Sequence, residues 1–173
     1  LGLSECNSVK EPIWADMLKN LMEREDAQGQ MDEEEFKLCQ QQIGDLLWIT
    51  QTTHPLLTLT TSVISSILKH KIKGTIDLIK HAWRWLQGTK SHALVKWKGN
   101  RSGPKFSSDA DYGGLYCITG QKQSRSGGVG EYDGFLFYWH SKMQKCKSTE
   151  CPDGYFLAQS TGESELYGIA DLV

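Results

Sequence analysis

Residues 74–98, GTIDLIKHAWRWLQGTKSHALVKWK, contain the change of pattern that decides the fold class. Up to Gly88 the apolar residues repeat with the period of a helix, which we expect to begin at Gly74-Thr75 and to stop at Gly88. Beyond Gly88, residues 92–98 have the composition of a strand. The expected helix has an apolar face and a polar, basic face. The apolar face holds Ile76, Ile79, Trp83 and Leu86, and the polar face holds Lys80, His81, Arg84 and Gln87.

Three further helices are expected upstream of this stretch. The first has Pro12 in its first turn, where the missing backbone N–H of proline is harmless. The second begins with Asp32 and Glu35, whose spacing is typical of a capping box. The third covers residues 56–68, where apolar residues again recur at helical spacing. The first half of the chain is therefore predicted to be helical.

Strands are expected downstream of residue 91. Asp133-Gly134 is the strongest hairpin signal of the chain. A last helix is expected to begin at Ser160-Thr161. Helices followed by strands and one helix indicate an α+β fold, with a helical domain at 1–91 and a second domain at 92–173. The expected strands cover residues 92–98, 105–109, 127–132, 135–140 and 155–159.

Charge is distributed unevenly along the 173 residues, although the net charge is only −2. Residues 1–35 hold ten acidic and three basic residues, residues 36–105 hold eleven basic and two acidic ones, and residues 106–173 hold nine acidic and five basic ones. The basic middle indicates a polyanionic partner, and a solvated charged face is the alternative. The candidate phosphate-binding residues are Lys69, Lys71, Lys73, Lys80, Arg84, Lys96, Lys98, Arg101 and Lys105.

Composition excludes several classes of protein. A hydrophobic fraction of 39% and a charged fraction of 23% argue against wholesale disorder. The most apolar stretch, 56–68, is interrupted by Thr and Ser and is shorter than the roughly 20 residues that span a bilayer, so we expect no membrane partner. Five scattered cysteines predict free thiols in a reducing compartment. Cys146 and Cys151 could also close a small loop or join His140 in a metal site.

Two pairs of carboxylates are candidate ligands for a divalent cation. Asp109 and Asp111 lie at the end of an expected strand, and Glu163 and Glu165 lie in the first turns of an expected helix. Mg²⁺ prefers hard oxygen ligands and takes one or two carboxylates together with substrate phosphates. The same residues are also consistent with a turn cap at the strand end and with acids that suit a helix dipole.

The segments around these carboxylates occur in an order that is similar to a known family. Residues 106–114 read FSSDADYGG, residues 124–127 SRSG, residues 139–145 WHSKMQK and residues 160–166 STGESEL. They resemble the Ser-Asp-Ala-Asp-aromatic, Ser-Thr-Ser-Gly, Trp-x-Ser-Lys-x-Gln and Ser-Thr-x-Glu-Ala-Glu-Tyr segments of the ribonuclease H domain in copia-type LTR retrotransposon Pol polyproteins. Residues 43–48 and 82–89 resemble the Gly-Ser-Leu-Leu-Tyr and Arg-Tyr-Leu-Lys-Gly-Thr segments near the end of that family's reverse transcriptase.

The resemblance covers residues 36–173 and implies a fold and a function. It implies the end of a reverse transcriptase, thumb- or connection-like, followed by the front part of a ribonuclease H-like mixed β-sheet with a C-terminal helix. It makes Asp109 and Glu165 catalytic ligands of Mg²⁺, or alternatively of Mn²⁺, with Asp111 and Glu163 as further candidate ligands. The implied reaction is two-metal hydrolysis of the RNA strand in RNA/DNA hybrids. The implied partners are the hybrid and the rest of Pol, in a cytoplasmic virus-like particle or the nucleus.

The chain also departs from the family's pattern. The third and fourth carboxylates of ribonuclease H lie beyond the glutamate helix, whereas this chain ends at Val173. Asp171 is a poor substitute, because it lies on a different side of the expected helix from Glu165. No Tyr-x-Asp-Asp type polymerase segment is present. We therefore expect no DNA synthesis and an incomplete nuclease site, and the alternative functions are a non-catalytic nucleic-acid-binding remnant and a plain interaction domain.

Overall fold

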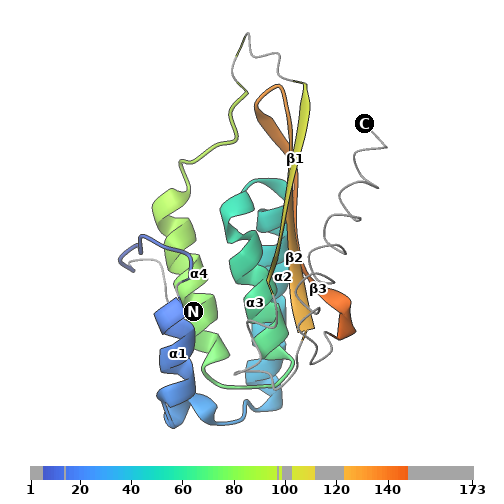
Figure 1. Ribbon diagram of the computed structural model, residues 1–173. Coiled ribbons are helices and arrows are strands. Elements are labelled where there is room, and N and C mark those ends of the chain that lie inside the picture. Colours follow the sequence, from blue (N-terminus) through green and yellow to red (C-terminus); the bar gives the residue numbers. More distant parts are fainter. Residues whose placement is uncertain (1–5, 14, 97, 99–102, 112–122, 148–173) are drawn as a thin grey trace. The chain divides into compact units, whose positions relative to one another are not determined.

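A computed structural model (Figure 1) describes residues 6–13, 15–96, 98, 103–111 and 123–147 of the chain. The chain divides into two compact units between Ala93 and Leu94, and the sequence predicted a boundary between residues 91 and 92. The described elements of the first unit are helices, and those of the second unit are strands. The predicted α+β class is therefore confirmed.

Six helical segments make up the described part of the first, helical unit. Pro12 precedes α1 and does not lie in its first turn as predicted. The third predicted helix, 56–68, begins in a 3-10 helix and becomes an α-helix at Thr58. None of the described helices combines the length and the apolar character needed to cross a lipid bilayer. The segments are α1 (Ala15–Glu23), η1 (Asp26–Gln28), α2 (Glu33–Thr52), η2 (Pro55–Leu57), α3 (Thr58–Leu68) and α4 (Thr75–Thr89).

The first turn of α2 is stabilised by the predicted capping box. Asp32 Oδ1 accepts a hydrogen bond from the backbone N–H of Glu35 at 2.8 Å, and Glu35 Oε2 accepts one from the N–H of Asp32 at 3.1 Å. These bonds satisfy two backbone donors that have no partner inside the helix. The sequence therefore predicted the start of α2 correctly.

The core of the helical unit is formed mainly by α2, α3 and α4 (Figure 1). Leu46 of α2 and Ile64 and Ile67 of α3 are completely buried. Two hydroxyls inside this core pair with each other, Thr50 Oγ1 and Thr61 Oγ1, at 3.2 Å. Apolar burial of this extent is the main stabilising contribution in a helical bundle.

The faces predicted for α4 are partly wrong. Trp85 is buried and Trp83 is only half-buried, while His81, predicted on the polar face, is 5% exposed. His81 is buried because an N-terminal segment covers it: its Nε2 lies 2.8 Å from the carbonyl oxygen of Glu11. The helix also continues through Gly88, where the side chain of Ser8 approaches so closely that a Cβ would lie 2.6 Å from Ser8 Cβ.

The second unit, here called the sheet unit, contains a three-stranded antiparallel sheet in the order β1-β2-β3. The strands are β1 (Pro104–Asp111), β2 (Gln123–Tyr132) and β3 (Phe135–Lys147). The predicted hairpin at Asp133-Gly134 is confirmed, with positive φ angles of 50° and 74° at these two residues. Such angles are what a tight two-residue hairpin turn requires.

One strand predicted near this unit is wrong, and two further predicted elements lie outside the described residues. Residues 92–96 and 98 are not in a strand, so the strand predicted at 92–98 is wrong for them. Strand-like composition does not suffice without a neighbouring strand that accepts the backbone hydrogen bonds. The described strands are antiparallel, and the strand and helix predicted at 155–159 and from Ser160 onward lie outside the described residues.

Candidate metal site and nucleic-acid interface

The register of the sheet places Asp109 and Asp111 on one face of β1. Asp109 lies opposite Gly127, and Asp111 lies opposite Arg125. Residues that are directly opposite in neighbouring strands share a face, and alternate residues of one strand do so as well. The register thus brings two carboxylates and the buried side chain of Arg125 to one face of the sheet, which we call the aspartate face (Asp109, Asp111, Arg125 and Gly127).

Asp109 and Asp111 are both exposed, and they differ in their cross-strand neighbours. Asp109 Oδ1 accepts a hydrogen bond from the N–H of Ala110 at 2.9 Å. A Cβ added at Gly127 would meet only backbone oxygens, those of Asp109 at 3.8 Å and of His140 at 3.9 Å. A side chain as small as alanine would therefore make only ordinary van der Waals contacts at this position.

Arg125 is the residue that the sequence analysis did not assign to the site. It is only 4% exposed, and its Nη2 donates to Met143 Sδ at 3.2 Å. Burial lowers the pKa of the Arg125 guanidinium, and the negative charge of Asp111 partly opposes that shift. Arginine nevertheless remains a cation in proteins. One signal in the sequence could have pointed to this residue: the segment SRSG has Arg125 where the resembled Ser-Thr-Ser-Gly segment has threonine.

The aspartate face fits a magnesium ion in part. Asp109 offers the hard carboxylate oxygens that Mg²⁺ prefers, and Asp111 offers the same oxygens opposite Arg125. Among the described residues, no three His, Cys, Asp or Glu side chains form a group that could hold a metal ion. Glu163 and Glu165 lie outside the described residues, so their convergence with Asp109 stays a prediction.

The cysteine and histidine alternative gains no support in the described part of the chain. The Nδ1 atom of His140 lies 2.9 Å from the hydroxyl of Tyr138. Cys6 and Cys39 are free thiols, and burial is the main cause of a raised pKa of the Cys39 thiol, with a smaller contribution from Glu35. Cys151, one member of the proposed ligand pair, lies outside the described residues.

Acidic residues of the helical unit neutralise part of the basic stretch. Lys71 Nζ lies 3.0 Å from Glu33 Oε2 and 4.6 Å from the centroid of the Phe36 ring. Lys73 Nζ lies 3.6 Å from Glu35 Oε2. Both lysines follow α3, in a connection whose backbone pairs with residues 29–31. These two candidate phosphate ligands thus have partners within the chain.

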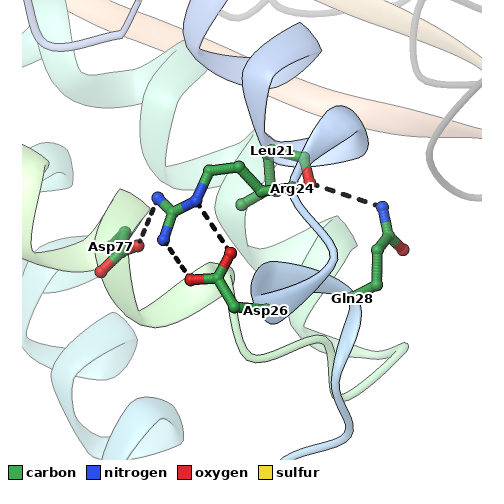
Figure 2. Close-up of polar contacts among 5 residues, drawn as sticks. All are labelled: Leu21, Arg24, Asp26, Gln28 and Asp77. Carbon is green, nitrogen blue, oxygen red and sulfur yellow. Dashed lines mark hydrogen bonds and ion pairs between the residues drawn. The ribbon is translucent and has the colours of Figure 1, made fainter.

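Two arginines of the helical unit also form hydrogen bonds or ion pairs with other residues of the chain. Arg84 Nε donates to the carbonyl oxygen of Asn7 at 2.9 Å. Figure 2 shows Arg24 between two carboxylates, with nitrogens 2.6 Å from Asp26 Oδ2 and 3.2 Å from Asp77 Oδ2. The hydrogen bond from Arg24 lowers the pKa of the Asp26 carboxyl and raises that of the guanidinium.

The remaining candidate phosphate ligands are more accessible. Lys69 at the end of α3, Lys98, and Lys105 on β1 are exposed, and Lys80 is half-buried. Lys96 Nζ lies 5.9 Å from the centroid of the Tyr132 ring, which is too far for more than a weak cation–π interaction. Arg101 lies outside the described residues. Their role in binding nucleic acid stays a prediction.

Comparisons of the chain with family models, with curated proteins and with solved structures give no match. The resemblance to copia-type Pol polyproteins therefore depends on the sequence motifs alone. The described parts of three motifs lie on β1, β2 and β3, which are neighbours in the sheet.

Proposed function

We propose that the chain is part of a retrotransposon Pol polyprotein and that its sheet unit belongs to a ribonuclease H acting on RNA/DNA hybrids. The supporting observation is the exposed carboxylate of Asp109, whose cross-strand neighbour Gly127 has no side chain. The order of the motifs along the chain agrees with this assignment. Hydrolysis of the RNA strand is the reaction that this family resemblance implies.

In this proposal the lack of a side chain at Gly127 lets the phosphodiester backbone of the hybrid approach Asp109. A divalent cation bound there would supply Lewis acidity for the phosphate and lower the pKa of a bound water. Glu165 would be the second ligand. The chain's own contribution at β1 is to hold the Asp109 carboxylate, through its bond to the Ala110 N–H, at an accessible edge of the sheet.

Exposed lysines would bind the phosphates of the hybrid. Lys69, Lys98 and Lys105 have the exposure that this role needs. Each phosphate that is neutralised releases counterions, so affinity should fall steeply as salt increases. A flat salt response of hybrid binding would contradict the role of these lysines.

Cleavage of an RNA/DNA hybrid by the polyprotein that carries this chain tests the proposal. We expect Mg²⁺-dependent cleavage of the RNA strand, which either Asp109→Asn or Glu165→Gln abolishes. Asp45→Asn, an exposed position of α2, is the matched control and should retain cleavage. Normal cleavage by both site variants would refute the assignment.

A non-catalytic nucleic-acid-binding remnant is the second candidate function. The observation that favours it is Arg125, a buried cation placed opposite one of the two aspartates. A remnant would bind the hybrid with strong salt dependence and would not cleave it, even as part of the polyprotein. Binding and cleavage measured on the same hybrid separate the two functions.

A further inference from the structure

We propose that residues 6–13, here called the strap, cover a phosphate-binding surface of α4, so that release of the strap strengthens binding of the RNA/DNA hybrid. The inference deepens the proposed function, because it assigns a regulatory contact to the basic stretch of the chain. It rests on the nucleic-acid-binding part of that function and is independent of cleavage.

The covered surface is one side of α4. Four residues recur at helical spacing and therefore lie on this side of the helix: Lys80, His81, Arg84 and Gly88. Lys80 and Arg84 are half-buried, and none of the ion pairs among the described residues involves either of them. This side of α4 therefore carries positive charge of the kind that phosphates recognise.

The strap binds this side of α4 through its main chain (Figure 1). Arg84 Nε donates a hydrogen bond to the carbonyl oxygen of Asn7 at 2.9 Å. His81 Nε2 lies 2.8 Å from the carbonyl oxygen of Glu11. Since a guanidinium offers the same N–H groups to carbonyl and to phosphate oxygens, the Asn7 carbonyl takes a donor that could otherwise bind the hybrid.

The strap is an occupant that a nucleic acid can replace. Four of its residues are exposed, so their side chains bury little surface against α4: Asn7, Ser8, Lys10 and Glu11. Segments with few buried contacts open at a low cost in free energy. A phosphate oxygen carries charge and a carbonyl oxygen does not, and charge-assisted hydrogen bonds are the stronger ones. The hybrid should therefore compete with the strap for Arg84.

A substitution at Gly88 releases the strap without altering its sequence. In Gly88→Ala the new Cβ would lie 2.6 Å from Ser8 Cβ, so the strap must move. The matched control is Gly44→Ala in α2, where a Cβ meets nothing within 4 Å. Adding Ser8→Gly to Gly88→Ala restores docking, because the nearest strap atom is then the Cα of residue 8 at 3.9 Å. Alkylation of the half-buried Cys6 thiol, followed by mass spectrometry, measures release.

Binding of an RNA/DNA hybrid to the whole chain, measured over a range of salt concentrations, tests the proposal. We expect faster alkylation of Cys6 in Gly88→Ala and at least about tenfold tighter binding at low salt, because up to about two further phosphates are contacted. The dependence of log affinity on log salt should steepen by about one to two. Gly44→Ala and the double variant should stay within about threefold of the unaltered chain. Arg84→Gln added to Gly88→Ala should lose most of the gain.

Two results would overturn the proposal: faster alkylation of Cys6 with unchanged hybrid affinity, or a gain in affinity that survives Arg84→Gln. Should Gly88→Ala fail to fold, Ser8→Leu enlarges the same contact from the strap and leaves α4 unaltered. Unchanged alkylation of Cys6 in both variants would contradict a strap that can be released. If release tightens hybrid binding but the polyprotein does not cleave the hybrid, the ribonuclease assignment alone fails.

Discussion

The two units differ in what they bury. All the buried apolar side chains of the described residues belong to the helical unit, with Leu46 and Ile64 among the most buried. In the sheet unit, the buried side chains of the described strands are polar or charged, such as Ser126, Arg125 and Gln144. Gln144 Nε2 donates to Ser126 Oγ at 2.8 Å, which satisfies one of these polar groups.

This contrast suggests different roles for the two units. Burial of apolar surface stabilises a fold without specifying chemistry, whereas buried polar groups are costly unless each has a partner. The buried polar side chains of the sheet therefore need hydrogen-bond partners, as Ser126 has in Gln144. We expect substitutions in the core of the helical unit to change mainly stability, and substitutions on the aspartate face of the sheet unit to change ligand binding as well.

The largest effect should come from the helical core. Ile64→Ala removes a fully buried side chain and should lower the free energy of unfolding by about 2–5 kcal/mol. Val129→Ala, at a 38% exposed position of β2, should cost less than about 1 kcal/mol. Denaturant unfolding of both variants measures the difference, and a sheet variant as damaging as the core variant would break the contrast.

The next largest loss of stability is expected for a substitution at Gly130 of β2. A Cβ at Gly130 would lie 2.8 Å from Phe106 Cε1 and 3.2 Å from Phe137 Cζ, two rings that already pack edge to face. Gly130→Ala should therefore destabilise the sheet by about 1–3 kcal/mol.

Gly127→Ala is the matched control for that substitution. Its Cβ has room, and its stability should stay within about 1 kcal/mol of the unaltered chain. Thermal melting measures both variants. Equal losses for the two glycines would contradict the packing argument.

A smaller loss of stability is expected when the ion pair between Glu33 and Lys71 is removed. Glu33→Gln removes the ion pair with Lys71 and should cost less than about 1 kcal/mol, since both side chains are largely exposed. The same change should strengthen hybrid binding at low salt, because Lys71 becomes available to phosphates. Glu34→Gln, an exposed neighbour with no ion pair among the described residues, controls for the change in net charge. Identical hybrid affinities for the two variants would show that Lys71 takes no part in binding.

The smallest effect concerns pH. Arg24 lowers the pKa of Asp26, so this carboxylate contributes stability at pH values above its unfolded pKa of about 3.9. That contribution is lost as the pH falls through the lowered pKa of the folded chain. The melting temperatures of the unaltered chain and Asp26→Asn should therefore differ slightly at neutral pH and converge in acid. If the difference in melting temperature grew as the pH fell, the predicted direction of the pH dependence would be wrong.

Local signals explain what could be predicted from the sequence. The capping box of Asp32 and Glu35 and the hairpin turn at Asp133-Gly134 are confirmed, because each depends on residues within a few positions of one another. The α+β class could be predicted for the same reason, since helix and strand patterns are read over short windows. These features needed no knowledge of distant contacts.

Features that depend on distant partners could not be predicted. His81 was placed on a polar face because its partner, the carbonyl oxygen of Glu11, is 70 residues away. Gly88 was taken as a helix stop because nothing local indicated that Ser8 packs against it. The position of Arg125 opposite Asp111 required the register between β1 and β2, which no turn signal specifies. The candidate site was thus predicted as two aspartates without the cation opposite one of them.

The N-terminal segment that lies against α4 has a consequence for synthesis of the protein. Asn7 and Glu11 bond to Arg84 and His81 over separations of 77 and 70 residues. On a translating ribosome, α1 to α3 therefore emerge before the surface that receives this segment exists. Residues 7–11 must wait for α4, so closure of the helical unit should be a late and comparatively slow event in its folding.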